Sequence, residues 1–195
     1  MSRLLVAAPL RLEAMLISSA ARDALVRKTG MGPSRAKSAA GQLAGDAAAR
    51  LLVVGFCGGL DEEAVPGEVI VAEEVYAAGD EGHAEVRVRC ELAGELVRGL
   101  TGRGMKVRVG NVVCVSRLAL GERRAELHAG GAIAVDMESV WLADAARERP
   151  FGVVRVVLDS PRHELMRPQA IGGALRAARA LRRVAGALHE LAPGD

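Results

Sequence analysis

The sequence predicts an α/β fold, a single three-layer domain over residues 1–195 with helices flanking a mixed, largely parallel central sheet. Short apolar runs alternate with segments of helical periodicity along the whole chain. Half of the residues are hydrophobic, so a chain of 195 residues can bury a full core. Several apolar runs are continuous rather than alternating, which is typical of strands covered on both faces.

The elements follow one another without a linker or an internal repeat. The expected strands are short runs rich in Val, Leu, Ile and Ala, at residues 4–8, 24–29, 51–57, 68–77, 84–90, 106–115, 132–135 and 151–158. The expected helices have apolar residues at helical spacing, at about 12–20, 33–43, 91–103, 122–128, 137–147 and 169–191. Pro33 or Ser34 begins the second helix, and residues 79–83 are expected to form a loop.

Composition excludes several classes of protein. The chain has 26 basic and 24 acidic residues, which gives no basis for nucleic-acid binding. Its three cysteines are widely spaced and its histidines show no ligand spacing, so we expect no metal, no cofactor and no disulfide framework. The first apolar run is too short for a signal peptide, and no stretch approaches the ~20 apolar residues of a membrane span. We therefore expect a cytoplasmic protein.

Two segments next to expected strands could contact a ligand. Gly58 and Gly59 follow a buried strand, where glycine lets the backbone approach a ligand closely; a tight turn without a ligand is the alternative. The segment 136–139, Asp-Met-Glu-Ser, opens an expected helix. The Glu138 carboxylate can accept hydrogen bonds from sugar hydroxyls, and Met137 can form a soft apolar wall. Alternatively, the acidic residues only favour a helix N-terminus.

Three further charged residues are candidates for chemistry. Asp159 ends a Val-rich strand, where an apolar setting would let it keep a proton and act as a general acid; capping the turn before Pro161 is the alternative. Arg155 lies four residues earlier, on the same face if the strand is regular. It either orients Asp159 or has a structural role, which we favour. Glu13 follows the first strand and is either functional or a solvated helix residue.

Five segments in order over residues 1–165 resemble the purine nucleoside phosphorylase and nucleosidase superfamily. They are Glu13, 29–33 with Ala36, 54–60 with 65–72, 134–139 and 150–160. The resemblance implies that Glu138 and Met137 bind ribose, that Asp159 gives a proton to a purine base and that Glu13 binds the attacking water. It also places Gly58, Gly59, Gly30, Gly32, Arg155 and Phe151 near the base or a bound anion.

The resemblance further implies cleavage of the N-glycosidic bond of an adenosine-type purine nucleoside. Hydrolysis is favoured because residues 52–56, Leu-Val-Val-Gly-Phe, offer no arginine where the phosphorylase branch has one, and because Glu13 matches the water-using branch. Inorganic phosphate would be needed only by a phosphorylase, and Gly30 to Gly32 with Arg35 offer an anion nest for it. A phosphate-dependent phosphorylase, a futalosine hydrolase and a non-catalytic nucleoside-binding homologue remain alternatives.

The substrate and partners follow from a narrower resemblance. The compact chain is similar to the hopanoid-associated phosphorylase branch, which implies a hopanoid-linked adenosine, although Leu158 replaces the family's Ser before the acidic residue. Family members are homo-oligomers, dimers or larger, and we expect the same here. The last helix carries Arg176, Arg179, Arg182 and Arg183. A terminal helix packed on the sheet is favoured, with peripheral membrane contact as the alternative.

Overall fold

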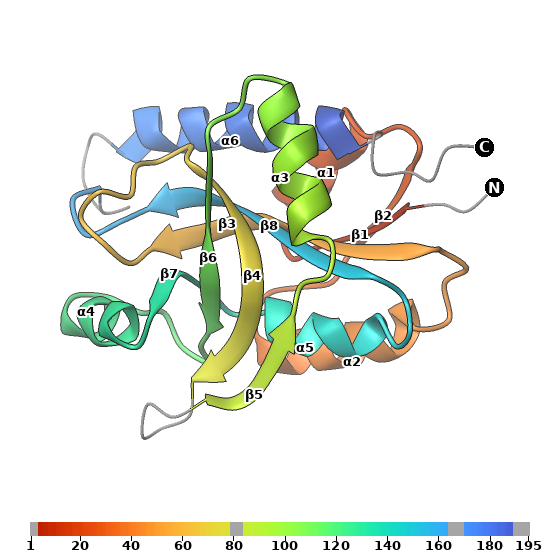
Figure 1. Ribbon diagram of the computed structural model, residues 1–195, viewed down its shortest axis with the longest axis horizontal. Helices are drawn as coiled ribbons and strands as arrows, with labels where there is room; N and C mark the ends of the chain where they lie inside the picture. The colour runs from red at the N-terminus through yellow and green to blue at the C-terminus, as the bar shows by residue number, and fades with distance from the viewer. Residues whose placement is uncertain (1–3, 79–83, 164–169, 189–195) are drawn as a thin grey trace.

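The computed structural model describes residues 4–78, 84–163 and 170–188 (Figure 1). The strands are β1 (Leu4–Ala8), β2 (Ala24–Lys28), β3 (Arg50–Gly59), β4 (Val69–Ala78), β5 (Ala84–Arg89), β6 (Val107–Cys114), β7 (Ala132–Asp136) and β8 (Phe151–Asp159). The helices are α1 (Arg11–Ser18), α2 (Pro33–Leu43), α3 (Ala93–Gly102), α4 (Glu122–Ala129), α5 (Ser139–Leu142) and α6 (Ala170–Ala187). The loop expected at 79–83 and the expected ends of the last helix, at 169 and 189–191, lie outside the described residues.

One expected helix is much shorter in the structure. In place of a helix over 137–147, α5 covers only Ser139–Leu142 and is followed by a single 3₁₀ turn, Ala143–Ala145. The Asp136 side chain accepts hydrogen bonds from the amides of Glu138 and Ser139, which delays the start of the helix. Arg147, with φ 52°, interrupts helical geometry at the other end. Met137 and Glu138 therefore lie in a connection, not in a helix.

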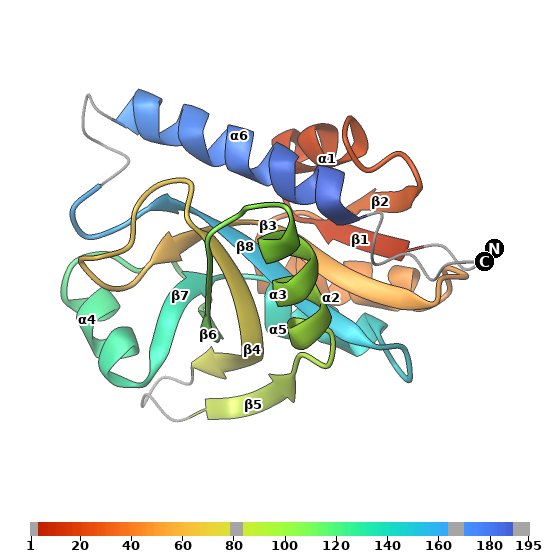
Figure 2. The same ribbon diagram turned by 45° about the horizontal axis from the view of Figure 1, so that its top comes forward.

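The sheet is mixed and largely parallel, as the sequence predicts, and it bends into a partly closed ring (Figures 1 and 2). Strands β2, β1, β3 and β8 pair in parallel, and so do β4, β6 and β7. Antiparallel pairings of β8 with β4 and of β7 with β3 join the two sets. The ring brings the ends of β7 and β8 beside the Gly58–Gly59 end of β3.

Helices cover both faces of the sheet, which confirms the three-layer prediction. Helices α1, α3 and α6 pack on one face over a cluster that includes Val154 and Val156. Helices α2 and α5 pack on the other face, over Val153 and Val157. The alternation along β8 explains why this strand is apolar at nearly every position. Helix α4 lies beside β7, over a smaller third cluster.

The three cysteines are free and buried. Burial raises the pKa of all three thiols, to about 12 for Cys90, so these groups stay protonated at neutral pH. Within residues 4–78, 84–163 and 170–188, no helix is long and apolar enough to cross a membrane. The same residues contain no group of three or more His, Cys, Asp or Glu placed to hold a metal ion.

Candidate active site

Arg155 is the centre of a buried charged cluster on β8. It is fully buried, and its Nη2 lies 2.6 Å from Asp136 Oδ2 and 3.7 Å from Glu138 Oε2. The same nitrogen donates a 2.9 Å hydrogen bond to Ser139 Oγ. One guanidinium therefore serves two carboxylates, and Glu13 adds a third negative group close enough to raise the pKa of Arg155.

Asp136 holds this guanidinium in place. It accepts hydrogen bonds from the Cys114 thiol at 2.8 Å and from the amides of Glu138 and Ser139 at 3.1 and 3.2 Å. The Ser139 hydroxyl also donates to it. Burial would raise the pKa of Asp136, but Arg155 and these donors keep it below its ordinary value. Asp136 is thus a fixed anion whose acceptor positions are occupied.

The charge of Glu138 is less well compensated by neighbouring groups than the charge of Asp136. Its Oε1 accepts a 2.8 Å hydrogen bond from the amide of Gly32, a residue with φ 92° that favours glycine. Burial raises the pKa of Glu138 to about 7, with the Arg155 charge opposing and the Asp136 charge adding to the effect. At neutral pH this carboxyl is poised between its two protonation states, whereas Asp136 beside it stays ionised.

Glu13 is buried as deeply as the sheet residues, so it is not the solvated helix residue of the alternative interpretation. Its two oxygens accept 2.6 Å hydrogen bonds from the amides of Leu10 and Phe56. Burial raises its pKa, and the charge of Arg155 lowers it. A β-carbon at Gly55 would lie 2.6 Å from Glu13 Oε1 and 2.8 Å from Arg155 Nη1, so glycine permits this close approach.

Asp159 belongs to a second buried pair. Its Oδ2 lies 2.5 Å from Nη2 of Arg124, and both side chains are almost fully buried. Arg124 is held by hydrogen bonds to the carbonyls of Ala119 at 2.9 Å and Gly59 at 3.3 Å. The apolar setting expected for Asp159 is therefore wrong, because a guanidinium faces its carboxylate.

The expectation that Arg155 could orient Asp159 is also wrong. In the pairing of β3 with β8, Cys57 lies opposite Val157 and Gly58 opposite Asp159. Leu158 is an extra residue, and such a bulge breaks the two-residue alternation that would put Arg155 and Asp159 on one face. Arg155 pairs with Asp136 instead, in the structural role that the sequence favours.

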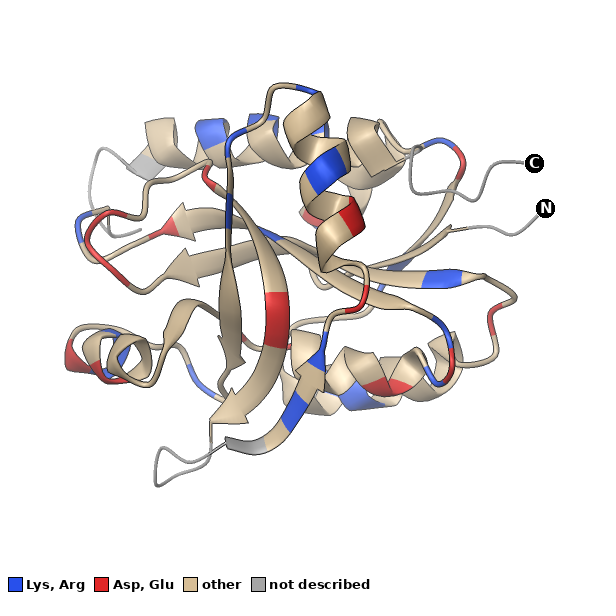
Figure 3. Ribbon diagram, viewed as in Figure 1, with Lys and Arg blue, Asp and Glu red and all other residues tan. Residues whose placement is uncertain are grey.

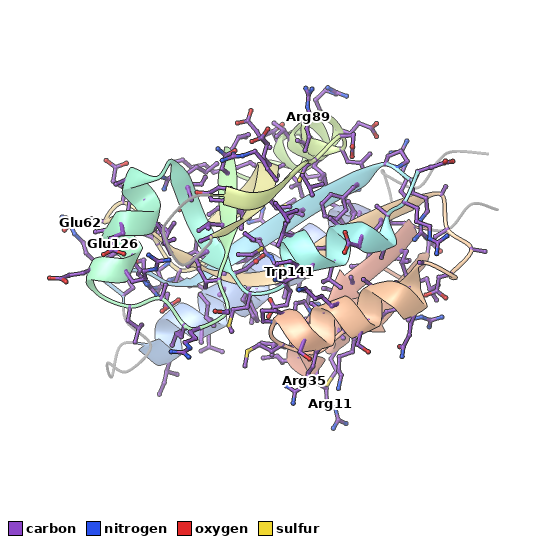
Figure 4. All side chains as sticks on the ribbon, turned by 90° about the horizontal axis from the view of Figure 1, so that it is seen from below. Arg11, Arg35, Glu62, Arg89, Glu126 and Trp141 are labelled. Carbon is purple, nitrogen blue, oxygen red and sulfur yellow. The ribbon has the colours of Figure 1, made fainter. Side chains whose placement is uncertain are left out.

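The predicted glycines lie beside the two clusters. Gly58 and Gly59 lie inside β3 and do not form a turn, and a β-carbon at Gly58 would be 3.3 Å from both Asp159 Oδ1 and Arg124 Nη2. Gly30 and Gly32 have positive φ, as the predicted turn requires. The Gly32 amide is used by Glu138. Arg35, expected to complete an anion nest, is exposed and extends from the edge that also carries Arg11 (Figure 4).

Phe151 and Met137 are placed differently from each other. Phe151 begins the nine-residue strand that Asp159 ends, so about 25 Å separates them at ~3.3 Å per residue. It is buried in the core, and its predicted place near the base is wrong. Met137 is half-buried against the cluster that contains Leu60 and Tyr76, beside Glu138 as the sequence predicts.

Sequence reasoning missed Arg124 and Asp136. Two adjacent arginines in a short polar helix look like surface charges, and Arg123 does pair with Glu126 at the surface. The missed indication was that Arg124 shares a helix face with Leu127, three residues later, and both are buried. Asp136 was noted only as an acidic residue near a helix start, because sequence spacing does not show that β8 places Arg155 beside it.

Fold and site together define a three-layer α/β protein with buried, carboxylate-rich clusters near the ends of β1, β7 and β8. A family model described as the Phosphorylase superfamily matches residues 11–190. The chain belongs to this superfamily, which confirms the membership predicted from the sequence. No curated protein is similar enough to match the chain.

Solved structures show the same fold. The chain is similar to a 5'-methylthioadenosine/S-adenosylhomocysteine nucleosidase from Helicobacter pylori in complex with butyl-thio-DADMe-Immucillin-A, with TM-score 0.81, 13% identity and coverage of 98% and 97% of the two chains. Futalosine hydrolase from the same organism has a TM-score of 0.81 and 13% identity, with coverage of 97% of each chain. A 5'-methylthioadenosine/S-adenosylhomocysteine nucleosidase from Neisseria meningitidis in complex with methylthio-immucillin-A has a TM-score of 0.77 and 18% identity. The match covers 95% of this chain and 99% of that chain. These likenesses establish the fold over nearly the whole chain.

Proposed function

We propose that this protein hydrolyses the N-glycosidic bond of an adenosine-type purine nucleoside and releases the free base. The observation that carries the proposal is the burial of Glu13 and Glu138 around one shared arginine in a chain of this superfamily. Several solved structures that share its fold are named nucleosidases or hydrolases, which supports the same class of reaction.

The carboxylates suit the charge that develops in such a reaction. Breaking the bond leaves positive charge on the sugar ring, and a nearby anion with hydroxyl contacts is stabilising in that state. Glu138 accepts hydrogen bonds from a ribose hydroxyl, and Met137 packs on the sugar. Glu13 binds the attacking water. Each Glu13 oxygen accepts a hydrogen bond from one backbone amide, which leaves lone pairs free to bind a water molecule.

Asp159 supplies the proton that makes the base a better leaving group. In the structure the carboxylate is paired with Arg124, so Asp159 must leave this partner and take up a proton from solvent water before it can protonate the base. The base nitrogen replaces the guanidinium as the partner of Asp159, and Arg124 stays anchored by the carbonyls of Ala119 and Gly59. Gly58 packs closely beside both groups, where a β-carbon would crowd Arg124 and Asp159.

Hydrolysis is favoured over phosphorolysis because the buried cations of the site are already neutralised. Arg155 is engaged by Asp136 and Glu138, and Arg124 by Asp159. A phosphate would need a further cation, and the sequence offers Arg35, whose side chain packs on Gly30 outside the buried cluster. A hopanoid-linked adenosine as the substrate, a homo-oligomeric assembly, a cytoplasmic location and membrane contact through α6 stay predictions.

Base release measured with and without phosphate tests the proposal. The purified protein is incubated with adenosine, 5'-methylthioadenosine, futalosine and an adenosine with a long apolar 5' group, and free base is measured by chromatography. We expect release in phosphate-free buffer. Strict dependence on phosphate would show a phosphorylase and overturn hydrolysis. Binding without release from any of these nucleosides would show a non-catalytic homologue.

A further inference from the structure

A pocket lies on the face of the sheet covered by α6, opposite the helices α2 and α5. It has a volume of about 520 Å³, within the range of small-molecule sites. Its walls are α6, the turn before β4 and the residues before β6. Its lining includes four cationic side chains, those of Lys106, Arg176, Arg179 and Arg183. Val65 and Met105 contribute apolar surface.

Three arginines of one helix face line this pocket. Arg176, Arg179 and Arg183 follow the three- and four-residue spacing that places side chains on one side of a helix. All three are exposed, and none makes an ion pair with any residue of the described ranges. Lys106 adds a fourth cation from the facing segment. Basic residues on α6 and near the start of β6 lie on the same side of the molecule in Figure 3.

The pocket wall opposite these arginines is fixed in place. The turn at Pro66 and Gly67 packs directly on α6, since a β-carbon at Gly173 would lie 3.3 Å from the Pro66 ring. The Gly67 amide donates a 2.8 Å hydrogen bond to the carbonyl of Val157, and the Val157 amide donates at 2.9 Å to the carbonyl of Glu68. The arginines therefore face a wall that is tied to the central strand β8.

One acidic residue lines the pocket without cancelling its charge. Glu68 lies 3.7 Å from Nη1 of Arg108, and its Oε2 accepts no hydrogen bond from the described residues. Burial raises the pKa of Glu68, and Arg108 opposes the rise. Arg108 is bound more closely by Asp61 and offsets the Glu68 charge only in part. Three arginines of α6 and Lys106 still outnumber this one acidic residue of the lining.

We propose that this pocket binds a phosphate-bearing ligand, with the phosphoryl group held by Arg176, Arg179 and Arg183. Guanidinium groups match phosphate oxygens with paired, charge-assisted hydrogen bonds. Val65 and Met105 contact the apolar part of the ligand. The ligand is either a free phosphate ester or the headgroup of an anionic phospholipid, since both present the same group. The site does not depend on the proposed nucleosidase activity, because the Arg155 cluster lies toward the other face of the sheet.

The test compares the pocket arginines with a matched neighbour. The triple variant Arg176→Gln, Arg179→Gln, Arg183→Gln removes the proposed contacts, while Arg182→Gln removes an exposed arginine of α6 that does not line the pocket. Pyrophosphate binding is measured by calorimetry. Co-sedimentation is measured with phosphatidylcholine vesicles with and without phosphatidylglycerol. Circular dichroism establishes whether each variant is folded. If the triple variant is not folded, the three single variants are measured in its place.

We expect the pocket variants to weaken binding about tenfold or more and Arg182→Gln to leave it close to wild type. Loss of pyrophosphate binding identifies a free phosphate ester, and loss confined to phosphatidylglycerol vesicles identifies a lipid headgroup. Equal losses in Arg182→Gln and the pocket variants would show only a diffuse basic surface. That result, binding unaffected by the pocket variants, or no binding of either probe to wild type would overturn the proposal.

Discussion

The two buried arginines are matched to carboxylates in different ratios. Arg155 lies among three carboxylates and bonds most closely to Asp136, so Glu138 and Glu13 are buried with incomplete compensation and raised pKa values. Arg124 faces Asp159 alone, at 2.5 Å. Surplus carboxylates suit a site that meets a cationic transition state, whereas a one-to-one pair holds a single group in position until a substrate replaces its partner.

Replacing Asp159 is the largest change we expect in activity. Asp159→Asn keeps the shape of the side chain but removes its proton-donating role, so kcat falls by about 10²–10⁴. Turnover is measured by base release, and the unfolding transition is recorded to establish that the variant is folded. Activity near that of wild type would remove Asp159 from the mechanism and leave its pairing with Arg124 as a purely structural contact.

Replacing Arg155 is expected to cause the largest loss of unfolding free energy. Arg155→Met leaves Asp136 charged, buried and without its cation, which costs about 3–5 kcal/mol of unfolding free energy. Urea unfolding at pH 7 measures the loss. Arg155→Lys keeps the charge and serves as the conservative comparison. Its loss is smaller than that of Arg155→Met but not zero, because an ammonium lacks the further nitrogens that contact Ser139 and the carbonyl of Phe56. Equal stability of Arg155→Met and wild type would contradict the central role of this residue.

Much of the fold followed from the sequence because continuous apolar strands and helical spacing are local patterns. The site was predicted unevenly. Glu13, Glu138 and Asp159 were selected because their segments resemble those of the superfamily, and their positions next to expected strands agreed with that choice. The partner of Asp159 was missed because Arg124 comes from a helix distant in the chain. The prediction that Arg155 and Asp159 share a face failed because Leu158 forms a bulge in β8. Such an extra residue depends on how β3 curves against β8, which the sequence does not show.

Arg124 and Arg123 offer a matched pair of variants. Arg124→Gln leaves Asp159 buried without its cation, with an expected loss of about 3 kcal/mol and a lower kcat/KM. Arg123→Gln removes an exposed ion pair with Glu126 and is expected to change stability by less than about 0.5 kcal/mol. Chemical unfolding and base release are measured for both. Similar effects of the two changes would show that Arg124 does not hold Asp159.

The pH dependence of stability tests the surplus of carboxylates around Arg155. The pKa of Glu138 is about 7 in the folded protein and about 4.5 in the unfolded chain, so the folded state retains a proton that the unfolded state has lost between these values. Unfolding free energy therefore falls as pH rises from about 4.5 to about 7, by up to about 3 kcal/mol at ~1.4 kcal/mol per pKa unit. Glu138→Gln keeps an acceptor for the Gly32 amide and removes this contribution, which leaves a shallower slope from the other carboxyls with raised pKa values, Glu13 and Glu68. Urea unfolding of both proteins across this pH range measures the difference. Parallel curves would show that Arg155 compensates Glu138 as fully as it does Asp136, and the contrast between surplus and paired carboxylates would then be lost.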